Sequence, residues 1–91
     1  MSAFTEIAEH MAPRIMAVAR MILRDDDLAA EATQDTLLRM WIELPRLRRP
    51  DRLQGWVHTI TTNECRQELR RNQRRERLVN QLDPNPTVAA A

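Results

Sequence analysis

The stretch from Asp51 to Arg77 constrains the fold most, because it carries two side-chain stripes at helical spacing. The apolar stripe recurs at i, i+3, i+4 and i+7 and comprises Leu53, Trp56, Val57 and Ile60. The polar stripe recurs every three, four or seven residues and comprises Thr59, Asn63, Arg66, Arg70 and Arg77. The pattern predicts one helix with a face built for burial beside a face of amide, hydroxyl and guanidinium groups.

A first helix is predicted over residues ~4–23 from an apolar series at the same spacing. The series comprises Phe4, Ile7, Ala8, Met11, Ile15, Val18 and Ile22. Pro13 lies inside it, so we expect a kink at Pro13 or a new helical segment that begins there. Met16 and Met21 are interpreted as core-filling side chains rather than as metal or cofactor ligands.

A second helix is predicted over residues ~27–44, capped by the run of carboxylates at 25–27. Its expected core face comprises Ala30, Thr33, Leu37, Met40, Trp41 and Leu44. A second stripe falls on a different side and comprises Glu31, Gln34, Asp35, Leu38 and Ile42. Two interpretations are open from the pattern alone: a recognition surface, or a wide stripe that packs on two neighbouring helices.

The segment 45–50 between the second and third helices is a short basic loop with a proline at each end and three arginines. Such a loop is a candidate reader of bases or phosphates, and a solvated connector is the alternative. Asp51 is expected to cap the third helix, with Gln54 completing a capping box. Leu78, Val79 and Leu82 are expected to add a final packed turn after Arg77.

The chain is expected to form one all-α, compact three-helix domain over residues 1–82, followed by a linker or cut end over 83–91. Residues 1–43 carry a net charge of −4 and residues 44–91 a net charge of +5, with no lysine in the chain. This asymmetry indicates a polyanionic partner for the second half, although many basic helix faces are only solvated.

Several other classes are disfavoured by composition and motifs. The chain lacks an apolar run long enough to cross a bilayer and lacks a signal peptide, so no membrane partner is expected. The single Cys65 suits a reducing, cytoplasmic location. His58 and Cys65 lie seven residues apart without an orienting group, so an enzyme is not expected. We also expect no cofactor and no metal, since the acidic run at 25–27 lacks further ligands at calcium-loop spacing.

Over residues ~4–77 the sequence resembles region 2 of bacterial sigma factors, and most closely the extracytoplasmic-function (ECF) group of the sigma-70 family. The likeness rests on an ordered set at fixed spacing: Glu31, Gln34, Leu37, Trp41, Leu53, Trp56, Ile60, Asn63, Arg70 and Arg71. The sequence departs from the family pattern in three places. Leu28-Ala29-Ala30-Glu31 replaces a more acidic stretch, Leu37 replaces a phenylalanine, and Arg49-Pro50 replaces Gly-Asp in the loop.

The resemblance implies roles for two sets of residues. The polymerase-binding set, expected to dock on the clamp helices of the β′ subunit of core RNA polymerase, comprises Glu31, Gln34, Asp35, Leu38 and Ile42. The DNA-binding set comprises Leu47, Arg48, Arg49, Asp51, Arg52, Thr59, Asn63, Arg66, Gln67, Arg70 and Arg74. In that set the loop is expected to capture a base flipped out of the non-template strand of the −10 promoter element.

The function implied is therefore promoter recognition and melting at the −10 element, with core polymerase, promoter DNA and an anti-sigma factor as partners. The rival hypothesis is a sigma-like decoy or adaptor that binds an anti-sigma factor or polymerase without reading DNA. Such factors carry a second helical domain that reads the −35 element, and these 91 residues do not include it. We expect either an excised domain or a reduced relative.

Overall fold

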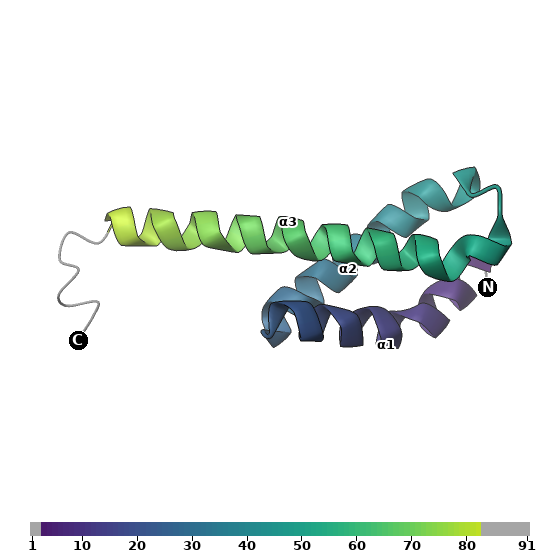
Figure 1. Ribbon diagram of the computed structural model, residues 1–91, viewed down its shortest axis with the longest axis horizontal. Coiled ribbons are helices and arrows are strands. Elements are labelled where there is room, and N and C mark those ends of the chain that lie inside the picture. The colour runs from purple at the N-terminus through teal and green to yellow at the C-terminus, as the bar shows by residue number, and fades with distance from the viewer. Residues whose placement is uncertain (1–2, 83–91) are drawn as a thin grey trace.

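A computed structural model describes residues 3–82, which form three α-helices and two 3₁₀ turns (Figure 1). The elements are α1 (Ala3–Leu23), α2 (Asp26–Glu43), η1 (Leu44–Arg46), η2 (Pro50–Arg52) and α3 (Leu53–Leu82). No strand occurs within the described range, so the all-α, three-helix prediction is confirmed. The predicted linker at 83–91 lies outside the described residues.

Helix ends follow the polar residues that flank them. Asp25 caps α2, and its Oδ1 accepts a hydrogen bond from the Leu28 N–H at 2.9 Å, as the acidic run predicted. Arg24 adopts a left-handed φ of 54°, which reverses the chain between α1 and α2. α1 continues through Pro13 as a single helix, so the alternative of a new segment beginning there is wrong, and the kink stays a prediction.

The entry to α3 differs from the expected capping box. Asp51 lies inside η2, after Pro50 at the first position of that turn, and no side chain caps the turn. The Asp51 carboxylate instead lies 3.4 Å from Nη2 of Arg49. A proline-initiated 3₁₀ turn leads directly into α3, because the fixed φ of proline favours a helical start without a capping side chain.

The core lies where the three helices cross, in two adjoining clusters. The larger side chains come from all three helices and comprise Met11, Ile15, Met40, Val57 and Ile60. Small side chains let the helices approach near the α1–α2 turn, in a cluster comprising Ala19, Leu23, Ala29, Ala32 and Cys65. Leu53 and Trp56 pack on the first cluster and Met16 on the second, as their spacing predicted.

The predicted core faces of α1 and α2 were partly wrong. Ala30, Trp41, Met21 and Ile22 are exposed, and the buried face of α2 comprises Ala29, Ala32, Thr36 and Met40. Alanines and a threonine give a weak hydrophobic pattern. The prediction therefore followed the larger apolar residues at neighbouring positions and placed the buried face on the wrong side of α2. Thr36 tolerates burial because its hydroxyl donates to the Ala32 carbonyl at 2.7 Å.

α3 is longer than its partners and extends past them toward the C-terminus (Figure 1). The described part of the molecule is therefore elongated, with extents of 54 × 22 × 21 Å. Leu78, Val79 and Leu82 belong to the helix but are exposed, so the predicted packed turn is wrong. The α2–α3 loop lies at the opposite end of the molecule, near the start of α1 (Figure 1).

Candidate functional site

The loop between α2 and α3 borders an open pocket of about 980 Å³. Its wall contains six residues of the predicted DNA-binding set, namely Leu47, Arg48, Arg49, Asp51, Arg52 and Thr59. Arg46 adds a fourth guanidinium, and Glu43 joins Asp51 as the only other carboxylate of the lining. The pocket is therefore mainly cationic and accessible from outside, which fits a single-stranded or distorted nucleic acid better than a small neutral ligand.

Trp56 also lines this pocket, a position that its spacing in the sequence did not predict. Trp56 packs on the first core cluster and also lines the pocket, so one part of the indole is buried and another faces the opening. Periodicity assigned it to the buried face only. The signal that could have placed it at the pocket is its position four residues after Arg52 and three before Thr59, on one side of the helix.

The polar stripe of α3 leads away from the pocket along the helix. The predicted DNA-binding residues that lie on or beside this stripe are all exposed and comprise Thr59, Asn63, Arg66, Gln67, Arg70 and Arg74. Across residues 3–82, none of these three arginines forms an ion pair. The Thr59 hydroxyl donates to the Gly55 carbonyl at 3.0 Å, so in this state it offers only an acceptor to a ligand.

The second stripe of α2 is a surface and does not pack on a second neighbour. Leu38 and Ile42 are 56% and 60% exposed, and Glu31 and Gln34 are exposed beside them. These exposures rule out the wide-stripe packing interpretation for four of the five predicted polymerase-binding residues. Asp35 is the exception, because its carboxylate accepts a hydrogen bond from Nη2 of Arg71 at 2.9 Å.

A shallow groove of about 310 Å³ between α2 and α3 joins the two predicted sets. Leu38 and Ile42 line it from α2, and Gln67 lines it from α3. Gln67 therefore lies with the predicted docking residues, whereas the loop residues gather at the separate pocket. Asn63, Arg66, Arg70 and Arg74 lie outside both hollows, along the exposed side of α3.

A family model for sigma-70 region 2 matches residues 7–75, which span all three helices. The chain belongs to the sigma-70 region 2 family. No curated protein and no solved structure matches it significantly. Membership supports a sigma factor role in polymerase binding and promoter recognition.

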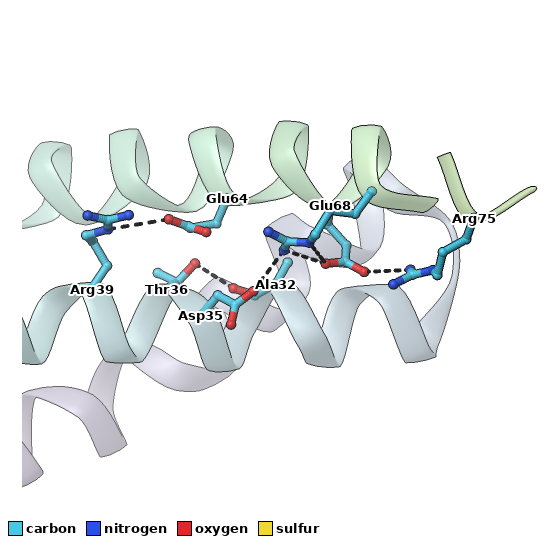
Figure 2. Close-up of polar contacts among 8 residues, drawn as sticks. Ala32, Asp35, Thr36, Arg39, Glu64, Glu68 and Arg75 are labelled. Carbon is cyan, nitrogen blue, oxygen red and sulfur yellow. Dashed lines mark hydrogen bonds and ion pairs between the residues drawn. The ribbon is translucent and has the colours of Figure 1, made fainter. Parts of the chain in front are cut away.

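In this sigma region 2 domain, an ionic cluster around the buried Glu68 links α3 to α2 (Figure 2). Glu68 is 2% exposed and accepts from Nη2 of Arg71 at 2.6 Å and from Nη2 of Arg75 at 3.2 Å. Arg71 also reaches Asp35 on α2, as described above. Burial opposes ionisation of Glu68, but hydrogen bonds from Arg71 and Arg75 outweigh it and lower the pKa of the carboxyl. Hydrogen bonding to Glu68 raises the pKa of Arg71.

A second ionic contact between the same helices lies one turn earlier. Glu64 is buried on α3, and its Oε1 lies 3.6 Å from Nε of Arg39 on α2 (Figure 2). Cys65 next to it is fully buried, and burial followed by the charges of Glu64 and Glu68 raises the pKa of its thiol. A buried, protonated thiol is a poor nucleophile, so His58 and Cys65 do not form a reactive pair.

Residues 3–82 contain neither a metal-binding cluster nor a membrane-spanning helix. No group of three or more His, Cys, Asp or Glu side chains in this range is arranged to hold a metal ion. None of the three helices is long and apolar enough to cross a membrane.

Proposed function

We propose that this domain docks on core RNA polymerase and recognises and melts the −10 promoter element. The observation that carries the proposal is the cationic pocket at the α2–α3 loop, which opens beside the exposed polar stripe of α3. The proposal includes a domain spanning 1–82, the ECF subgroup, a cytoplasmic location and an anti-sigma factor as a further partner.

The pocket suits an unstacked base of the non-template strand. Flipping a base costs a few kcal/mol of stacking, and stacking on an aromatic side chain returns about 1–3 kcal/mol. Trp56 presents such a ring in the pocket wall, next to Arg52 and the loop arginines. The arginines neutralise the adjacent phosphates, and this charge pairing stabilises the opened single strand when it is bound at the pocket.

The exposed stripe of α3 then lies against the upstream edge of the element. Asn63 carries an amide that can pair with a base edge, and Arg66, Arg70 and Arg74 carry guanidinium groups that form no ion pair with residues 3–82. Because these groups follow one another at helical spacing, they address one face of a nucleic acid. In this proposal Asn63 reads sequence and the arginines position the strand.

The exposed stripe of α2 is the proposed docking surface for the clamp helices of the β′ subunit. Leu38 and Ile42 supply apolar area, and Glu31 and Gln34 supply polar groups at its edge. Asp35 contributes through the internal ion pair with Arg71, which holds it at the margin of the same surface. A mixed apolar and polar stripe of this kind suits a helix of a partner protein.

Selection from a randomised single-stranded DNA library tests the reading function. The wild-type domain should enrich a common short motif, and Arg48→Ala/Arg49→Ala should weaken binding to the enriched strand while leaving binding to core polymerase intact. Affinity should fall with salt with a slope of about −3 to −4 on a log–log plot, as expected for four to six phosphate contacts to a single strand. Arg20→Ala, an exposed arginine of α1 outside the site, is the matched control.

The outcomes separate the proposal from its rival. Binding to core polymerase without enrichment of any motif would establish a decoy or adaptor and contradict DNA reading. Equal loss of polymerase and DNA binding in the loop variant would mean that the loop supports the fold instead.

A further inference from the structure

Gly55 is the single glycine of the chain, and it lies in the first turn of α3. Glycine in a helix is less favourable than alanine, because its backbone has more conformational freedom to lose on folding. A helical glycine therefore needs a reason, such as a positive φ, a close internal neighbour, or a ligand that approaches the backbone.

The first two reasons fail at Gly55. Its φ is not positive, so the backbone conformation is one that any residue adopts. A Cβ added at Gly55 would meet no atom within 4 Å from the rest of the described chain. The space over Gly55 is thus open to the exterior, and the fold itself does not require a glycine here.

Gly55 lies on the border between two hollows. One is the cationic pocket at the loop, and the other is a smaller hollow of about 280 Å³ between α1 and α3. Because Gly55 lines both, the missing side chain lowers the ridge that separates them. The two hollows therefore adjoin at Gly55, and the path between them crosses the start of α3.

Basic groups lie at both ends of this path. Arg48, Arg49 and Arg52 line the loop pocket, and Arg14 and His58 line the hollow on the other side. Arg14 forms no ion pair with any described residue, so its charge is available to a ligand. An extended polyanion that leaves the pocket across Gly55 would reach a second cationic site on α1.

We propose that single-stranded DNA passes over Gly55 with its sugar–phosphate backbone against α3, and continues from the loop pocket to Arg14. This inference rests on the proposed DNA-reading function and extends its binding site onto α1. The strand needs the close approach that only glycine permits, and a side chain at Gly55 displaces it from the helix surface. Arg14 then makes a phosphate contact outside the predicted DNA-binding set.

The test uses Gly55→Ala, Gly55→Leu and Arg14→Ala, with a fluorescein-labelled oligothymidine strand as the probe and anisotropy as the readout. Gly55→Ala should raise Tm by about 3 °C through the helix propensity of alanine, and still weaken binding. Gly55→Leu should weaken binding about tenfold because the leucine side chain displaces the strand from the helix surface, and Arg14→Ala should weaken binding about tenfold through loss of one charge-assisted hydrogen bond. Arg20→Ala, at an exposed position of α1 that lines neither hollow, should leave affinity unchanged.

Opposite changes in stability and affinity for Gly55→Ala would support the inference, because a structural role for the glycine predicts that both fall. Wild-type binding that is unchanged in Gly55→Leu and Arg14→Ala would overturn the inference and leave the proposed function standing. Absence of wild-type binding to any single strand, including those from the library selection, would overturn both.

Discussion

At the scale of single residues, Arg70 and Arg71 show how adjacent arginines of one motif divide between function and structure. Both match the paired arginines of the family pattern. Because successive side chains of a helix point in different directions, about 100° apart, the two arginines lie on different sides of α3. Arg70 is exposed without an ion pair in the described structure, whereas Arg71 binds Glu68 and Asp35. Sequence spacing alone could not distinguish them, because the partner Asp35 comes from another helix.

This division gives a paired prediction. Arg71→Ala should lower the free energy of unfolding by about 1–3 kcal/mol, because it leaves the buried Glu68 carboxylate with Arg75 alone. Arg70→Ala should change it by no more than about 0.5 kcal/mol and should weaken DNA binding. Urea denaturation and DNA titration of both variants check this. Equal effects of the two on stability would contradict the assignment.

The lowered pKa of Glu68 predicts a pH dependence of stability. Its stabilising contribution is present above its ordinary pKa of about 4.5 and is lost as the pH falls through the lower folded-state value. Glu68→Gln should therefore cost about 1–2 kcal/mol at neutral pH, and the gap to wild type should narrow as the pH drops below 4.5.

Urea denaturation across a pH series measures this gap. Glu76→Gln is the matched control, because Glu76 is an exposed glutamate of the same helix. A gap for Glu68→Gln that stays constant with pH would show that the carboxylate charge is not what stabilises the helix pair.

At the scale of helices, periodicity predicted three elements and most of the exposed polar positions correctly. It failed for α2, where Ala29, Ala32 and Thr36 form the buried face and Trp41 lies outside it. Helix packing selects small side chains where axes approach closely, and a hydrophobic pattern does not reveal this. The Trp41 ring still contacts Phe4 edge-on, with centroids 5.0 Å apart, but most of it faces outward.

The far end of α3 shows the same limit and supplies a prediction. Leu78→Ala/Val79→Ala should change the free energy of unfolding by no more than about 0.5 kcal/mol, since both side chains are exposed. Ile60→Ala, in the buried part of the same helix, should cost about 2–5 kcal/mol. Thermal and urea unfolding check both variants, and a comparable loss in the two would restore the packed-turn prediction.

At the scale of the whole molecule, three features depend on how the helices are assembled: the loop pocket, the α2 surface and the path across Gly55. The members of the pocket come from the end of α2, the loop with its two 3₁₀ turns and the start of α3, so the sequence predicted most of its residues but not that Glu43, Gly55 and Trp56 join them. The ionic cluster of Glu68 was not predicted either, because the sequence of a polar helix does not distinguish a buried glutamate from the exposed charged residues around it. These cross-helix contacts hold the proposed docking and reading surfaces in fixed relation.

Binding to core RNA polymerase, compared between wild type and Gln34→Ala/Leu38→Ala, tests the proposed docking surface most directly. Gln73→Ala/Leu78→Ala is the matched control, since Leu78 is 57% exposed against 56% for Leu38 and carries the same chemistry on a surface without a proposed role. Circular dichroism establishes that all three proteins are folded. We predict tight wild-type binding, a loss of about tenfold or more in the docking variant and no loss in the control. Absence of wild-type binding, or equal loss in both variants, would contradict this prediction.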